Sequence, residues 1–229
     1  MPLGARRRHD VVDIPIEGLV VRVSGGLGLE AEIRAAGMQA WEQIQAYCTR
    51  DDAFRMHRRP VEVPETAPPL ARRLADTSAV AGVGPRFALR GALVDAVGLA
   101  LTEHRSEFMV TCAGDAFVAA RHRSRLTLLQ GSAALASGLA VVVGPDLGPV
   151  GIYATSRDGR SSAPEGTAVT VVATTCVLAD AAAAGSVMLL SRRGFRAALA
   201  YLQRVPGVHG GVVVQGERIG FAGALELAA

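Results

Sequence analysis

Between residues 168 and 190 the sequence carries a single charged side chain, Asp180. A stretch this apolar is expected to be buried away from water, either in a membrane or in a protein core. An acid at the middle of a spanning helix costs about 2.5–3.5 kcal/mol, and the first part of the stretch, AVTVVATT, is rich in β-branched residues. We therefore predict a buried strand followed by a buried alanine-rich helix. Asp180 has no salt-bridge partner within one helical turn, and this isolation makes it a candidate functional residue.

Composition narrows the class of protein. Of the 229 residues, 50% are hydrophobic and 20% are charged, as in a globular protein. All 24 basic residues are arginines and asparagine is absent, which excludes a phosphate-binding lysine loop, a Schiff-base lysine and N-glycosylation. The arginines are dispersed and aromatic residues make up 4%, so we expect no nucleic-acid binding. We expect a basic tail over residues 1–10 and one domain over residues 11–229.

The cysteines and the N-terminal segment bear on localisation. Cys48, Cys112 and Cys176 are far apart with no C-x-x-C pair, which is typical of reduced thiols. The opening MPLGARRRHDVVDIP has arginines but no apolar signal segment and no lipidation motif. We therefore expect a cytoplasmic protein that has no membrane segment. We separately expect a homo-oligomer.

Helices and strands are predicted in blocks and do not alternate strictly. The segments GLVVRVS and LEAEIRA, residues 18–24 and 29–35, flank GGLG and predict a hairpin. Helices are predicted over residues 38–56, 70–82, 86–104, 176–190 and 192–204. Strands are predicted within residues 107–113, 115–121, 125–131, 139–144, 150–155 and 167–175, followed by a hairpin over 210–223. This order predicts an α+β fold, a mainly antiparallel sheet packed with helices.

The segment GLGLEA after the first strand also fits a dinucleotide-binding fingerprint. A Rossmann unit needs a second apolar strand that ends in an acid. Here the polar segment TRDDAFRMHRRP follows instead, so we favour the hairpin.

Asp95, Asp115 and Asp180 each lie among small or apolar residues. Small neighbours leave room beside a carboxylate for a ligand or a hydrated metal ion. Each acid also has a structural alternative. Asp180 would face the positive end of its helix, Asp115 would bond its own turn, and Asp95 would lie on the wet edge of its helix.

Four motifs give a family resemblance. The motifs are RGALVDAVGLAL, VTCAGDAFVAA, GIYATSRDGRSS and AVTVVATTCVLADAAAAG. They occur in the order and rough spacing of the ApbE superfamily, whose founding activity is FAD:protein FMN transferase. The chain most resembles the short cytoplasmic branch labelled thiamine-biosynthesis-like, over about residues 19–188. In this comparison GLEAEIRA resembles a hairpin strand of that branch. The resemblance implies a single ApbE-like α+β domain with a flavin-type pocket between the sheet and its helices.

The resemblance also implies site residues. Asp180 matches the acid that holds a divalent metal beside the ligand's diphosphate, and Asp95 matches a further acid that we expect at the metal. Arg90 and Gly91 match the pair that opens the ligand-binding helix. The family's NGGD loop maps to Cys112, Ala113, Gly114 and Asp115.

Several positions depart from the family pattern. Ala184 replaces a threonine that helps to hold the metal, and Arg160 replaces a histidine. The loop TSRDGRSS offers hydroxyl donors and two guanidinium groups, which suit a phosphate or a carboxylate, although a solvated polar loop is an alternative. Cys112 is either a nucleophile or a buried structural thiol. The loop's candidate ligand-binding residues are Thr155, Ser156, Arg157, Arg160, Ser161 and Ser162.

Three functions remain open from the sequence. The first is an ApbE-like enzyme that binds a flavin or a nucleotide-like anion, with FMN-transferase chemistry, FAD or FMN as cofactor and weakly held Mg²⁺. In this enzyme Asp180 and Asp95 would supply carboxylates, and Arg160 and Arg90 would supply positive charge. Across the enzymatic alternatives the expected catalytic residues are Asp180, Asp115 and Arg160. The second is a hydrolase or ring-opening enzyme for a small anionic metabolite, with Asp115 or Asp180 as general base. The third is a flavin- or pterin-binding protein without catalysis.

Overall fold

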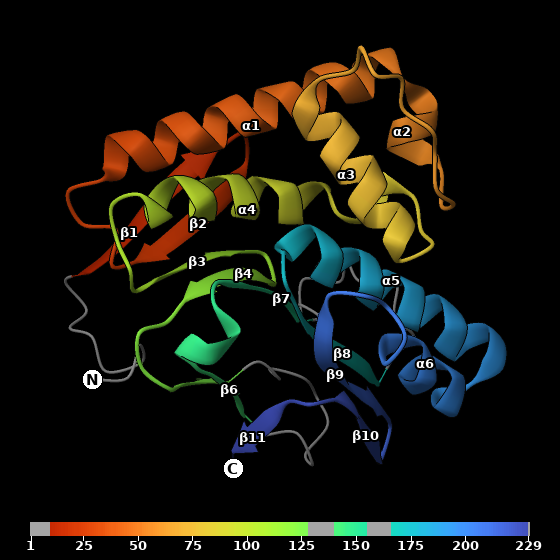
Figure 1. The fold of residues 1–229 in the computed structure, drawn as a ribbon. Helices are drawn as coiled ribbons and strands as arrows, with labels where there is room; N and C mark the ends of the chain where they lie inside the picture. Colours follow the sequence, from red (N-terminus) through yellow and green to blue (C-terminus); the bar gives the residue numbers. More distant parts are fainter. Residues whose placement is uncertain (1–9, 128–139, 155–165, 229) are drawn as a thin grey trace.

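The computed structural model (Figure 1) describes residues 10–127, 140–154 and 166–228. Its main sheet has eight strands in the order β1-β2-β3-β4-β7-β8-β9-β10, and every neighbouring pair is antiparallel. A second antiparallel sheet has the order β11-β6-β5. The strands are β1 (Val11–Ile16), β2 (Leu19–Ser24), β3 (Phe108–Cys112), β4 (Asp115–Ala119), β5 (Ser124–Thr127), β6 (Ala140–Val143), β7 (Val150–Ala154), β8 (Thr167–Ala173), β9 (Val208–Gln215), β10 (Arg218–Gly223) and β11 (Glu226–Ala228).

The helices cover one face of the main sheet, and the small sheet lies on the other face (Figure 1). Helices α1 and α4 pack over the half that contains β1 to β4, and α5 and α6 pack over the half that contains β7 to β10. The helices are α1 (Glu30–Arg50), α2 (Asp52–Met56), α3 (Pro69–Val80), α4 (Leu89–Thr102), α5 (Cys176–Arg193) and α6 (Phe195–Leu202). The predicted α+β class is confirmed.

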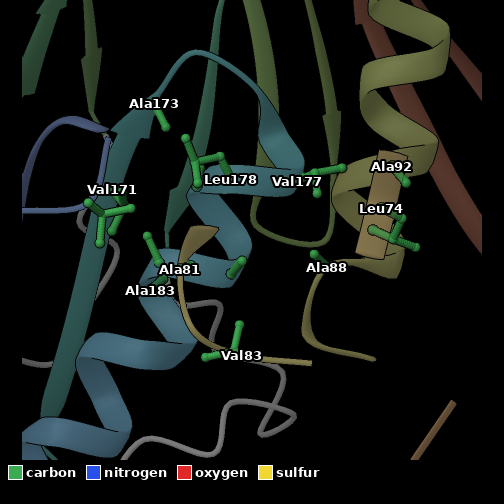
Figure 2. Close-up of a cluster of buried hydrophobic side chains, with 14 of the residues drawn as sticks. Leu74, Ala81, Val83, Ala88, Ala92, Val171, Ala173, Val177, Leu178 and Ala183 are labelled. Atoms are coloured by element: carbon green, nitrogen blue, oxygen red, sulfur yellow. The ribbon is translucent and has the colours of Figure 1, made fainter. Parts of the chain in front are cut away.

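The alanine-rich segment forms the centre of the core. Ala179, Ala181, Ala182 and Ala183 of α5 are fully buried. Figure 2 shows α5 against β8 and against the connection between α3 and α4. Because alanine side chains are short, the backbone of α5 lies close to its neighbours on several sides. The predicted buried strand and buried helix are therefore both confirmed. Within the part of the chain that the structure describes, no helix is long and apolar enough to cross a membrane.

The strand predicted over residues 29–35 is wrong. These residues form the first turns of α1, and β2 pairs instead with β1, a strand that was not predicted. The segment LEAEIRA alternates over a few residues, but the buried positions Ile33, Gly37, Ala40 and Ile44 follow the spacing of a helix. The Rossmann alternative is excluded because β2 and β3 are antiparallel.

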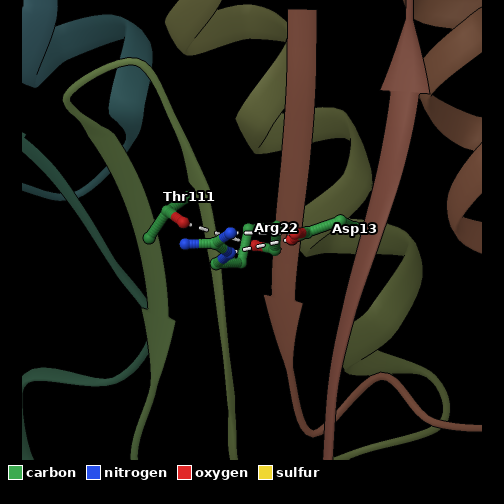
Figure 3. A network of polar contacts seen from close by, with 3 residues as sticks. All are labelled: Asp13, Arg22 and Thr111. Carbon is green, nitrogen blue, oxygen red and sulfur yellow. Dashed lines mark hydrogen bonds and ion pairs between the residues drawn. The ribbon is translucent and has the colours of Figure 1, made fainter.

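An exposed polar network links the first three strands (Figure 3). Arg22 donates from Nε and Nη2 to the two carboxylate oxygens of Asp13, each at 2.8 Å, across the β1–β2 pair. The Thr111 hydroxyl donates to the Arg22 carbonyl at 3.4 Å from β3. Exposed pairs of this kind typically add less than about 1 kcal/mol of stability. Asp13 therefore provides a reference against which the buried acids can be compared.

Candidate functional site

The structure brings the three candidate acids together in the interior. Asp95 of α4, Asp115 at the start of β4 and Asp180 of α5 are 5%, 1% and 3% exposed. Asp115 lies on the same side of β4 as Phe117, which packs under α4, so its side chain faces the helices. The alternative that places Asp95 on the wet edge of its helix is therefore excluded.

Two of these acids join the N-terminal ends of α4 and α5. Asp180 of α5 accepts a hydrogen bond from the Gly91 N–H in the first turn of α4, at 3.1 Å. In return, Asp95 of α4 accepts from the N–H groups of Cys176 and Val177 in the first turn of α5, at 2.8 and 3.0 Å. The first N–H groups of a helix have no partner within the helix and carry its positive end. Each helix thus supplies a carboxylate to the other.

Two glycines allow this close approach. A Cβ at Gly91 would lie 2.7 Å from the Cys176 carbonyl oxygen of α5. A Cβ at Gly151 of β7 would lie 2.0 Å from the Thr175 carbonyl carbon and the Cys176 nitrogen. Backbone atoms cannot move aside as a side chain can. The start of α5 is therefore held between α4 and β7 at a distance that only glycine permits.

Asp115 follows a tight turn of two residues with positive φ, Ala113 at 46° and Gly114 at 100°. Its carboxyl group is buried, and no N–H or hydroxyl group among the described residues donates to either oxygen. The carboxyl group of Asp180 lies close enough to form a hydrogen bond with it when one of the two is protonated. The nearest cation is Arg90, whose Nε lies 3.5 Å from Oδ2. A buried carboxyl group in this condition is uncommon and marks a candidate functional site.

Burial changes the protonation of the acids. It is the main cause that raises the pKa of Asp180 to about 7, while Arg90 and the Gly91 N–H oppose the shift. Burial raises the pKa of Asp115 well above its usual range, and the neighbouring Asp180 raises it further. Burial also raises the pKa of Asp95, against the effect of its two backbone partners on α5. The Asp115–Asp180 pair therefore holds a proton near neutral pH.

A cavity of about 340 Å³ opens beside Asp180. Its walls combine three kinds of side chain. The aromatic rings are Trp41, Phe87 and Tyr153, the cations are Arg86 and Arg90, and Asp180 is the acid. Ala184 also lines the cavity, so the position of the family threonine faces it without an oxygen. Rings and cations around a carboxylate can hold a flat anionic molecule.

Most of the predicted site residues that the structure describes lie at this place. Arg90, Gly91, Asp115 and Asp180 meet where α4, α5 and β4 converge. Gly114 and Cys112 lie beside them in the β3–β4 turn, where Cys112 pairs with Asp115. Burial raises the pKa of the Cys112 thiol to about 11, which favours the structural thiol over the nucleophile. The loop candidates Thr155, Ser156, Arg157, Arg160, Ser161 and Ser162 lie outside the described residues.

The metal site predicted at Asp180 and Asp95 stays a prediction. Asp95 was an expected ligand, but its two oxygens each accept a backbone N–H of α5. Within the described parts of the chain, no group of three or more His, Cys, Asp or Glu side chains is placed to hold a metal ion.

Sequence analysis missed the aromatic side of the cavity. Trp41 is the only tryptophan of the chain and lies on α1, far from every motif. Arg86 and Phe87 fall at the start of the helix predicted over residues 86–104, but in the structure they form a 3-10 turn, Pro85–Phe87, ahead of α4. Tyr153 pairs with Asp115 across β4 and β7. The closeness of Tyr153 to the TSRDGRSS loop in sequence was a usable signal, whereas nothing in the sequence singled out Trp41.

Comparisons with known proteins agree with this fold. A family model described as "AbpE bacteria" matches residues 2–192. A UPF0280 protein from Methanosarcina acetivorans is 24% identical over 184 residues, which are 79% of this chain and 73% of that protein. Two solved structures are similar at 12% identity, each over 93% of this chain and 96% of the other. They are the flavin transferase ApbE from Vibrio cholerae, with a TM-score of 0.58, and the ApbE protein from Thermotoga maritima, with a TM-score of 0.54. The chain belongs to the AbpE bacteria family and is a member of the ApbE-like superfamily.

Proposed function

We propose that this protein is an ApbE-like enzyme that binds a flavin nucleotide, FAD, beside Asp180 and transfers its FMN part to an acceptor protein, with AMP as the leaving group. The observation that carries the proposal is the wall of the 340 Å³ cavity, where aromatic rings, two arginines and a buried carboxylate converge. Trp41 and Phe87 offer flat surfaces for a ring system, and Arg86 and Arg90 suit a diphosphate. The similar structure from Vibrio cholerae is a flavin transferase by name.

The residues present fit a Mg²⁺ ion in part. No N–H or hydroxyl group among the described residues donates to the two Asp115 oxygens, and Asp180 is close enough to share a proton with Asp115. Mg²⁺ is usually held by one or two carboxylates, with waters and substrate phosphates at its other positions. We propose Asp115 and Asp180 as this pair, and not Asp95, whose oxygens bind α5. When bound, the ion would neutralise charge that develops on the diphosphate.

The chain's own groups would do the remaining work. Arg90 would bind a phosphate oxygen and keep its charge at any working pH. Asp115, protonated by burial, would give up its proton when a cation arrives. Arg160 follows Tyr153 by seven residues in the sequence and lies outside the described residues. We propose that it binds the anion, because a guanidinium cannot transfer the proton that a histidine would.

The carboxyl pair also favours a second candidate, a hydrolase or ring-opening enzyme for a small anionic metabolite. A carboxyl group with a pKa of about 7 can take up or release a proton at neutral pH, which suits general acid–base catalysis. In this scheme Asp180 would be the base, and no flavin would be needed.

Flavin binding can be followed at Trp41, because it is the only tryptophan. We expect FAD with Mg²⁺ to quench Trp41 fluorescence and Arg90→Gln to weaken the affinity by about tenfold or more, the scale of a charge-assisted hydrogen bond. Asp180→Asn should abolish Mg²⁺-dependent release of AMP from FAD, measured by chromatography. Arg22→Gln, which changes an exposed arginine that does not line the cavity, is the control and should match the wild type.

Two results would count against this function. If FAD leaves Trp41 fluorescence unchanged with and without Mg²⁺, the cavity does not bind flavin and the hydrolase becomes the better candidate. If FAD binds but no AMP is released in the presence of candidate acceptor proteins, the protein is a flavin-binding module without catalysis.

A further inference from the structure

A second cavity, of about 460 Å³, lies on a neighbouring face of α5. On α5 the first cavity is lined by residues 180, 183, 184 and 187, and the second by residues 185, 188, 189 and 192. Both sets have the i, i+3, i+4, i+7 spacing of one helix face, and a shift of five residues turns the second set away from the first. The connection between α3 and α4 lines both cavities, and Figure 2 shows its residues Ala81 and Val83 beside α5.

Three arginines, Arg58, Arg59 and Arg192, line the second cavity. Among the described residues that line it none is acidic, and no described carboxylate forms an ion pair with any of the three. Like charges that share a cavity repel one another, and an anion relieves that repulsion. The arrangement therefore differs from that of Arg22 and Arg55, which pair with neighbouring acids.

The backbone that carries two of these arginines is fixed. The Gly84 N–H donates to the Arg58 carbonyl at 3.0 Å, and Arg86 donates from Nη1 to the Met56 carbonyl at 2.9 Å. A Cβ at Gly84 would lie 2.2 Å from the His57 carbonyl oxygen and 2.7 Å from that of Arg59. The segment therefore packs against Gly84 at a distance that a larger residue would not allow.

The rest of the cavity is apolar. Val83, Met188 and Leu189 supply aliphatic and thioether surface, and the aromatic edge of Tyr201 is fixed by its hydroxyl, which donates to the Ala81 carbonyl at 2.6 Å. The volume lies within the range of small-molecule sites, about 300–1,000 Å³. A ligand that matches both parts has an anionic group for the arginines and an apolar group for the floor.

We infer that this cavity is a second ligand site, separate from the Asp180 cavity, that binds a small organic phosphate. The phosphate group lies among Arg58, Arg59 and Arg192, and the organic group lies against Val83, Met188 and Leu189. A phosphate accepts paired hydrogen bonds from guanidinium groups, so the three arginines suit a phosphate group.

Calorimetric titration with phenyl phosphate and with inorganic phosphate tests the site. We expect phenyl phosphate to bind more tightly than inorganic phosphate, because only phenyl phosphate contacts the apolar floor. The Arg58→Gln/Arg59→Gln/Arg192→Gln variant should bind phenyl phosphate at least about tenfold more weakly, since each lost charge-assisted hydrogen bond is worth about a factor of ten. Arg218→Gln, which changes an exposed arginine on β10, should bind like the wild type.

Two further measurements separate this site from the first cavity. Arg90→Gln should still bind phenyl phosphate, and the triple arginine variant should keep the wild-type response of Trp41 fluorescence to FAD. The three arginines are exposed, so the triple variant should melt like the wild type. The inference is overturned if the wild type does not bind phenyl phosphate, if the triple variant binds it unchanged, or if Arg90→Gln alone abolishes the binding.

Discussion

At the scale of single residues, the Asp115–Asp180 pair makes the stability of the free protein depend on pH. The ordinary pKa of both carboxyl groups is 3.8, and in the folded protein both are raised, that of Asp180 to about 7. Between these values the folded state holds protons that the unfolded chain releases. The contribution of Asp180 to the free energy of unfolding is therefore fully present below about pH 4 and is lost as the pH rises through about 7. The raised pKa of Asp115 adds a contribution of the same sign.

Replacing Asp115 with asparagine should remove much of this dependence. We expect Asp115→Asn to raise the melting temperature at about pH 8, where the wild type must ionise buried carboxyl groups, and to change it little at about pH 5. Asp13→Asn is the control. The side-chain hydrogen bond from Arg22 lowers the pKa of Asp13, so its titration ends well below the range tested. A wild-type melting temperature that rises between about pH 5 and pH 8 would contradict the assignment.

Ala113 holds a backbone conformation that suits glycine, with φ of 46°. The side chain of an L-residue is strained in this left-handed region, while glycine adopts it freely. We expect Ala113→Gly to stabilise the protein by about 0.5–1 kcal/mol, measured by urea unfolding, after the greater flexibility of glycine in the unfolded chain is subtracted. Ala31→Gly, on the exposed side of α1, should instead lower the free energy of unfolding by about 1 kcal/mol.

At the scale of helices and strands, the exchange of carboxylates between α4 and α5 should contribute more to stability than the exposed pair on the sheet. Asp95→Asn keeps the shape of the side chain but offers one acceptor to two N–H groups, so one buried donor loses its partner. We expect a loss of about 1–3 kcal/mol in the free energy of unfolding. Asp13→Asn should cost less than about 1 kcal/mol. Equal losses in the two variants would show that Asp95 does not hold α5.

Gly91 should be intolerant of the smallest side chain. Alanine is the better helix former by about 1 kcal/mol, so Gly91→Ala would stabilise an isolated α4. In the protein, the new Cβ would lie 2.7 Å from the Cys176 carbonyl oxygen. We expect the clash to outweigh the gain in helix propensity, so that the free energy of unfolding falls by about 1–3 kcal/mol and FAD binds more weakly. A higher melting temperature for Gly91→Ala would mean that α4 and α5 can move apart without loss.

Most helices and strands could be predicted because their hydrophobic period extends over enough residues. Strand β8 and helices α4 and α5 are examples. Residues 29–35 could not be predicted in this way. Their sequence, L-E-A-E-I-R-A, alternates as in a strand, and only the residues that follow it show the period of a helix. Strand β1 was missed for a related reason. It contains Pro15, and only its pairing with β2 identifies it as a strand at the edge of the sheet.

At the scale of the whole molecule, the acids of the site could be recognised from motifs, but their roles could not. Asp95 and Asp180 look alike in sequence, each a lone acid in an apolar helix. The structure separates them, because Asp95 is engaged by two N–H groups of α5 while Asp180 borders the cavity. Trp41 reaches the same cavity from a helix that begins far earlier in the chain. Such placements depend on how the layers pack and leave no local pattern.

The exchange of carboxylates between α4 and α5 also determines when the site can exist during folding. Its hydrogen bonds join residues 89, 81 and 82 positions apart. None can form before the intervening chain has closed, so the site assembles late, together with the middle of the sheet. The N–H protons of Gly91, Cys176 and Val177 should therefore exchange with deuterium only when the whole domain opens, at the rate of the slowest amides in β8. In a ribosome-bound chain that stops before α5, the Gly91 N–H in the first turn of α4 lacks the Asp180 carboxylate that accepts its hydrogen bond.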